Sequence, residues 1–85
     1  MIWLSPEATN HLMALPRDHQ ASIGRTIDRM RQDPFQGDVQ PLKGKRWQGR
    51  YRKRFSRYRL IFTPFHRDRM VEISAIMLHD EKTYR

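Results

Sequence analysis

Nine basic side chains and no acidic one lie in a single short segment: Lys43, Lys45, Arg46, Arg50, Arg52, Lys53, Arg54, Arg57 and Arg59. The other eight basic residues nearly balance the nine acidic ones, so this segment accounts for the formal net charge of +8. Such a local excess of cations indicates a polyanion site, and a solvated basic face is the alternative. Because a guanidinium fork matches phosphate oxygens, we expect a phosphodiester to bind here.

If the bound phosphodiester is RNA and is cleaved, His79 and Tyr84, near the C-terminus, are candidates for the proton-transferring groups that arginine cannot supply. Attack by the neighbouring 2′-hydroxyl needs a base, cations beside the phosphate, and an acid for the leaving 5′-oxygen. Arginine cannot titrate near neutral pH, whereas histidine has an ordinary pKa of about 6.5. Tyr84 can donate a proton or stack on a base, with a frayed terminus as the alternative.

The remaining histidines, His11, His19 and His66, are interpreted as surface or packing residues. The histidines and carboxylates have no metal-ligand spacing, and the chain has no cysteine. The stretch "LKGK" lacks the upstream glycine of a phosphate-binding loop. We therefore expect no metal and no cofactor.

A change of hydrophobic period identifies the strands that position the cations. From residue 50 onward, aromatic and aliphatic residues alternate with arginines, as in a half-buried strand. A two-residue turn at Ser56 and Arg57 predicts a hairpin in which Phe55 pairs with Tyr58 on the buried face. On the open face, Arg54 then lies opposite Arg59. The same register pairs Lys53 with Leu60, Tyr51 with Phe62 and Arg52 with Ile61.

The N-terminal half predicts a short strand and two helices. "IWL" at residues 2–4 is the strand, and Ser5 is an N-cap followed by proline at the first helical position. Apolar residues at helical spacing continue to Leu15, before Pro16 breaks the helix. Asp18 is the expected cap of a second helix, which carries Ile23, Ile27 and Met30 on one side and ends before Pro34.

The C-terminal half completes an α+β domain. Residues 35–49 predict a loop with at most one short strand, because glycines and prolines interrupt any periodicity. Residues 70–77 predict a final strand, with Val71, Ile73, Ala75 and Met77 on one side. The element order is β-α-α-β-β-β, an N-terminal strand and helical hairpin followed by an antiparallel meander. With 85 residues, the chain predicts one domain spanning residues 1–85.

Two classes of protein are disfavoured by the apolar pattern. No apolar run approaches the roughly 20 residues that span a bilayer. The N-terminus "MIWLSPEA" lacks the basic and apolar regions of a signal peptide. We therefore expect a cytoplasmic protein.

Four stretches of the sequence together resemble the RelE/ParE superfamily of toxins from type II toxin–antitoxin systems. They are "SPEA" at the first helix, "PLKG" before the sheet, "YRKRFSRYRLIF" as the hairpin, and the closing "HDEKTYR". The resemblance covers nearly the whole chain in the right order, and its most specific part is the hairpin. It implies the RelE-like fold and, for the RelE branch, a ribosome-dependent mRNA endoribonuclease (an mRNA interferase) held inactive by an acidic antitoxin.

The resemblance also implies which residues form the site. By motif position, the catalytic set corresponds to Arg52, Arg54, Arg59, His79 and Tyr84. The expected RNA-binding set is Lys43, Lys45, Arg46, Trp47, Arg50, Lys53 and Arg57, where Trp47 either stacks on a base or anchors its loop. Two residues depart from the family pattern. Lys53 replaces an apolar, inward-facing residue, and Asp80 replaces a common arginine.

Two other functions remain open from the sequence. The ParE branch implies inhibition of DNA gyrase without RNA cleavage, and Asp80 is compatible with that function. A non-catalytic nucleic-acid-binding module or a degenerate toxin that binds only its antitoxin is the third possibility. The basic hairpin together with His79 and Tyr84 favours the ribosome-dependent endoribonuclease.

Overall fold

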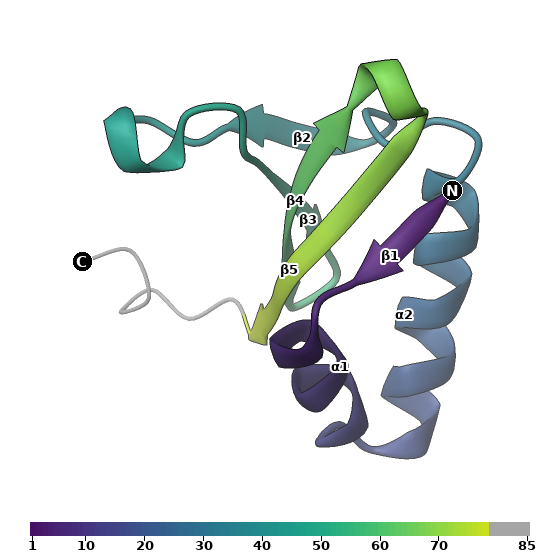
Figure 1. Ribbon diagram of the computed structural model, residues 1–85. Coiled ribbons are helices and arrows are strands. Elements are labelled where there is room, and N and C mark those ends of the chain that lie inside the picture. Colours follow the sequence, from purple (N-terminus) through teal and green to yellow (C-terminus); the bar gives the residue numbers. More distant parts are fainter. Residues whose placement is uncertain (79–85) are drawn as a thin grey trace.

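The computed structural model describes residues 1–78, which form one five-stranded sheet with two helices on one of its faces (Figure 1). The strands are β1 (Ile2–Leu4), β2 (Asp38–Pro41), β3 (Tyr51–Phe55), β4 (Tyr58–Phe65) and β5 (Met70–Leu78), and the helices are α1 (Pro6–Met13) and α2 (Arg17–Met30). The sheet order is β1-β5-β4-β3-β2, with only β1 parallel to its neighbour. The expected α+β fold is confirmed.

The two helix starts differ in how they are capped. The Ser5 hydroxyl accepts a hydrogen bond from the Ala8 backbone N–H at 3.1 Å, and Pro6 is the first helical residue, as expected. The predicted cap at Asp18 is wrong, because α2 begins at Arg17 and Asp18 lies in its first turn. Pro16 takes the N-cap position with extended geometry (φ −57°, ψ 152°), so the helix starts earlier.

The predicted register of the β3–β4 hairpin is confirmed at every pair. Phe55 lies opposite Tyr58, and Arg54 opposite Arg59. In the turn, Ser56 has a φ of 55°, which is a left-handed conformation. Glycine or asparagine usually takes this position, and the turn contains neither. The buried residues of this face pack against Ile23, Ile27 and Met30 of α2.

A β-bulge at Ser74 divides β5 into two halves that bury opposite residue parities. Its partners in β4 change from Ile61–Ala75 to Phe62–Ile73, which leaves Ser74 unpaired in the register. Val71 and Ile73 are buried before the bulge, and Ile76 after it. The prediction that Ala75 and Met77 share the side of Ile73 is therefore wrong.

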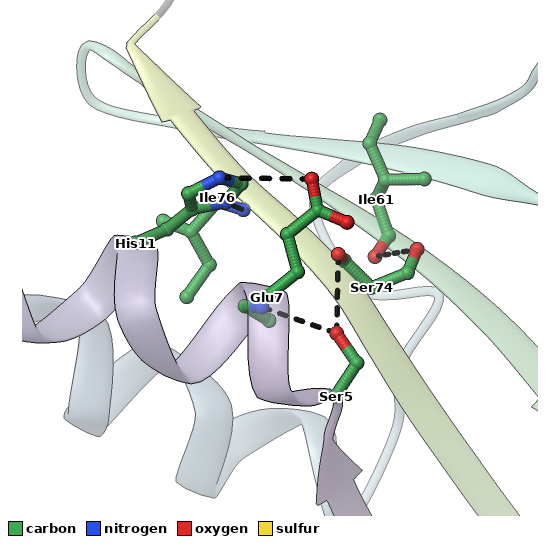
Figure 2. A network of polar contacts seen from close by, with 7 residues as sticks. Ser5, Glu7, His11, Ile61, Ser74 and Ile76 are labelled. Atoms are coloured by element: carbon green, nitrogen blue, oxygen red, sulfur yellow. Dashed lines mark hydrogen bonds and ion pairs between the residues drawn. The ribbon is translucent and has the colours of Figure 1, made fainter.

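Polar contacts from α1, from its N-cap Ser5 and from β4 meet at the bulge (Figure 2). The Ser74 hydroxyl donates to the Ile61 carbonyl at 3.3 Å, and the Ser5 hydroxyl donates to the Ser74 carbonyl at 3.2 Å. The Ile76 backbone N–H donates to Nδ1 of His11 at 3.2 Å. The helix start is thus tied directly to the irregular part of the strand.

The segment before the hairpin contributes one short edge strand, β2, antiparallel to β3. In the part of the chain described here, no helix is long and apolar enough to cross a membrane.

Candidate nucleic-acid interface

Arg52, Arg54 and Arg59 lie on the sheet face turned away from the helices, which we call the arginine face. This follows from the alternation of side chains along each strand, because Tyr58, Leu60 and their neighbours on β3 pack into the helix-side core. Arg54 and Arg59 are direct cross-strand partners. The hairpin therefore brings together the three arginines that the sequence places in one site.

The arginine face is covered over its centre, which corrects the expectation that all three arginines project into the open. Arg59 is only 4% exposed, and Ile61 on the same face is 5% exposed. Both belong to β4, which has a neighbouring strand on each side in the sheet. At the edge of the cluster, the Arg52 and Arg54 side chains are 11% and 40% exposed. Arg54 is thus the most accessible arginine of the three.

Asp38 of β2 adds a carboxylate that the sequence did not assign to the site. Its Oδ1 lies 3.3 Å from Nη1 of Arg52, and its Oδ2 lies 3.9 Å from Nη1 of Arg54. Repulsion between the arginines is therefore already reduced within the chain. Only the pairing of β2 with β3 could reveal this contact, because Asp38 lies 14 residues before Arg52.

Lys53 points to the opposite face, into the core, where it is 8% exposed. Its Nζ donates a hydrogen bond to the Gln36 carbonyl. Burial lowers the pKa of Lys53 below its usual 10.5; the Asp33 carboxylate opposes this shift, and Arg29 adds to it. A cation held on the helix side cannot reach a ligand on the arginine face. We therefore do not retain Lys53 among the RNA-binding residues.

A basic loop, residues 42–50, extends from the sheet away from the helices (Figure 1). The Leu42 N–H donates to the Arg50 carbonyl at 3.0 Å and closes the base of the loop. Two guanidinium groups lie over the Trp47 ring, with the Cζ of Arg46 at 5.5 Å and that of Arg50 at 5.6 Å from the ring centroid. These contacts orient the cations by cation–π attraction. Lys43 and Lys45 are exposed on the same loop.

Arg57 is exposed in the hairpin turn, beside a cavity of about 180 Å³ between the turn and the start of α2. Nδ1 of His19 shares a hydrogen bond with the Tyr58 hydroxyl there. His66 stacks on Phe35 with 6.3 Å between ring centroids, and His11 accepts from Ile76. The interpretation of these three histidines as packing or surface residues is consistent with these contacts.

Two residues of the expected catalytic set, His79 and Tyr84, lie outside the described residues, as does Asp80. Within residues 1–78, no three His, Asp or Glu side chains group closely enough to hold a metal ion. What the described surface can do chemically is bind phosphate oxygens and stabilise negative charge.

Comparison with known proteins rests on structure, because no protein-family model and no curated protein sequence matches the chain. The toxin–antitoxin complex RelBE2 from Mycobacterium tuberculosis has a chain that superposes with a TM-score of 0.82 at 19% identity, covering 92% of this chain and 95% of that one. The archaeal RelE–RelB complex from Pyrococcus horikoshii gives 0.77 at 21% identity, covering 94% of both chains. A YoeB/ParE toxin from Agrobacterium tumefaciens gives 0.76 at 16% identity, covering 93% of this chain and 98% of that one.

The chain has the fold of the RelE-like toxins. The correspondence covers more than nine tenths of both chains in each comparison. At sequence identities of 16–21%, these similarities support the fold alone. The chemistry of the site is therefore inferred from the arginine face.

Proposed function

We propose that this RelE-like chain is the toxin of a type II toxin–antitoxin system and cleaves mRNA on the ribosome. The observation that carries the proposal is the cross-strand pair Arg54–Arg59 with Arg52 beside it, on the sheet face opposite the helices. Similarity to chains crystallised with RelB antitoxins supports the toxin role. The ribosome and mRNA would place its action in the cytoplasm.

The proposed chemistry uses the RNA's own 2′-hydroxyl as nucleophile. Its oxygen forms a bond to the phosphorus, the bond to the 5′-oxygen breaks, and the products carry a 2′,3′-cyclic phosphate and a 5′-hydroxyl. Arg54 and Arg59 stabilise the charge that builds on the phosphate oxygens, for which the buried Arg59 has to become accessible to the RNA, and Arg52 supports them. His79 is the proposed proton-transfer group and Tyr84 its partner, both assigned from the sequence. No metal ion or cofactor takes part in this scheme.

The basic loop and the turn form the proposed surface for the rest of the RNA. The phosphates of the RNA contact four cations of the basic loop, Lys43, Lys45, Arg46 and Arg50. Trp47 orients the last two of these cations, and Arg57 extends the phosphate-binding surface to the hairpin turn. Because the basic loop projects from the sheet, it can contact an RNA strand that passes over the arginine face (Figure 1). An acidic antitoxin supplies carboxylates to the same cations, which explains how the site would be held inactive.

The decisive experiment maps mRNA cleavage on translating ribosomes with the purified chain. We expect cleavage at defined codons, with 2′,3′-cyclic phosphate and 5′-hydroxyl ends, and growth arrest on expression without the antitoxin. A single 2′-deoxy substitution on the 5′ side of the cleaved bond should prevent cleavage there. Cleavage that persists at the 2′-deoxy position would contradict the mechanism.

Inhibition of DNA gyrase is the second candidate, since a YoeB/ParE toxin shares the fold. A supercoiling assay with purified gyrase distinguishes the two functions. Arrest of supercoiling together with intact mRNA on ribosomes would replace the endoribonuclease proposal.

A further inference from the structure

One carboxylate spans two of the three arginines of the proposed site. Asp38 lies directly opposite Arg54 in the β2–β3 register, and Gln40 lies opposite Arg52. From that position its two oxygens reach Arg54 across the strand and Arg52 along the diagonal, at 3.9 and 3.3 Å. A phosphate approaching the arginine face therefore meets guanidinium groups that already have a negative partner.

We propose that Asp38 is a positioning residue that fixes Arg52 and occupies the anion position at Arg54 that an RNA phosphate takes over. The inference rests on the proposed function, because it treats the arginine face as the surface that receives the scissile phosphate. Asp38 then has two opposing effects. It weakens phosphate binding by competition, and it raises the cleavage rate by orienting Arg52.

The ion pairs of Asp38 with Arg52 and with Arg54 differ in distance and in exposure, as the two proposed roles of Asp38 require. Arg52 donates a hydrogen bond to Oδ1 at 3.3 Å, and its side chain is largely buried, so its orientation is fixed. Arg54 is too far from Oδ2, at 3.9 Å, for a hydrogen bond, and its side chain is well exposed. Replacement of the Asp38 carboxylate by a phosphate therefore requires little free energy at Arg54 and much more at Arg52.

The backbone beside Asp38 is held from the other side of the sheet. Lys53 donates to the carbonyl of Gln36, two residues before Asp38. Gly37 has a φ of 88°, and a Cβ there would lie 3.4 Å from the Lys53 Nζ. These contacts fix where β2 begins, so Asp38 meets the arginines from a defined position. Lys53 on the helix side and Asp38 on the arginine face are thus linked through Gln36 and Gly37.

The binding experiment uses a fluorescent, single-stranded oligoribonucleotide with 2′-O-methyl groups, which cannot be cleaved through its 2′ oxygens. Asp38→Asn should bind it about three- to tenfold more tightly at low salt, since a charge close to the phosphate is removed. The slope of log affinity against log salt should steepen by about 0.7, the value for one more phosphate contact on a single strand.

Asp28→Asn is the matched control. Asp28 also pairs with an arginine, Arg31 at 3.2 Å, and its loss changes the net charge equally, but it lies on α2 at the helix side. The control should tighten binding clearly less than Asp38→Asn. Equal tightening would mean that only net charge matters, and the proposal would be overturned.

The rate experiment separates positioning from a general loss of structure. In single-turnover cleavage on ribosomes at saturating enzyme, Asp38→Asn should be about tenfold slower, because the Arg52 fork is no longer held in its productive orientation. Asp38→Glu, which keeps the charge, should bind RNA like the wild type and recover part of the rate. A merely structural residue would lower affinity and rate together, with a lower unfolding temperature, and that result would overturn the proposal.

Failure of the proposed function would be visible separately. If the wild-type chain cleaves no RNA, elution from a heparin column still tests the competition at Arg54, because heparin is a polyanion without a cleavable phosphodiester. Asp38→Asn should elute at higher salt than Asp28→Asn. Elution of both variants at the same salt would overturn the assignment of Asp38.

Discussion

Lys53 and Arg54 are neighbours on β3, yet they meet opposite surroundings. Lys53 is directed into the helix-side core and bonds a backbone carbonyl, and its pKa is lowered by burial. Arg54 lies on the arginine face with a carboxylate nearby and much of its side chain in solvent. An ammonium group on a flexible stem can be buried by losing some of its basicity, whereas a guanidinium keeps its charge and needs an anion. The two faces of the hairpin therefore use positive charge for different purposes.

The strongest test of this contrast is Arg59→Lys, which keeps the charge of the arginine face but removes the fork. We expect the cleavage rate to fall about 10²- to 10³-fold, with little change in RNA affinity, because the lost donors act on charge that develops in the transition state. Single-turnover cleavage and binding by the uncleavable oligonucleotide measure the two effects. Arg25→Lys, at an exposed position on α2, is the control. A wild-type rate for Arg59→Lys would remove Arg59 from the proposed mechanism.

His11→Ala tests the β-bulge at Ser74, which determines which residues of β5 lie on the helix side of the sheet. The Ile76 N–H would lose its acceptor beside the bulge, so we expect the free energy of unfolding to fall by about 1 to 2 kcal/mol. Urea unfolding measures it, with Thr9→Ala on the exposed side of α1 as the control. Unchanged stability would show that the bulge forms without His11.

Lys53→Met should remove the desolvated charge from the core side but also lose the hydrogen bond to the Gln36 carbonyl, so we expect the stability at neutral pH to change by no more than about 1 kcal/mol. In the native protein the lowered pKa of Lys53 means that the unfolded chain binds more protons between the folded pKa and 10.5. Its stability should therefore rise with pH through that window. The variant should lack this rise, and Lys45→Met, in the exposed loop, should retain it. Identical pH profiles of the native protein and Lys53→Met would contradict this assignment.

The smallest effect is expected at the basic loop, where Lys45 is exposed. Lys45→Ala should weaken RNA binding a few-fold and reduce the salt slope by about 0.7, while the cleavage position stays the same. Fluorescence titrations at several salt concentrations measure this change. Arg67→Ala, an exposed cation in the β4–β5 turn, should change the slope less. Equal slopes for both variants would indicate that the loop does not follow the RNA.

Local alternation predicted the hairpin and its arginine face because strand pairing depends on residues that are near in sequence. Arg54 opposite Arg59 follows from a two-residue turn and a period of two. The bulge at Ser74 could not be predicted in this way. Its hydrogen-bond partners outside the β4–β5 pair, the Ser5 hydroxyl and the His11 imidazole, lie more than sixty residues away in the chain.

The sequence by itself determined the α+β order of elements apart from the edge strand β2, the place of the cationic segment and the pairing of its arginines, because hydrophobic period, caps and turns are local properties. The tertiary structure decided which cations are accessible. Arg59 of the central strand β4 is buried, Lys53 is tied to the segment before β2, and Asp38 reaches Arg52 and Arg54 only because β2 adds to the edge of β3. Burial and charge pairing depend on residues distant in the chain, so they appear only when the sheet is assembled.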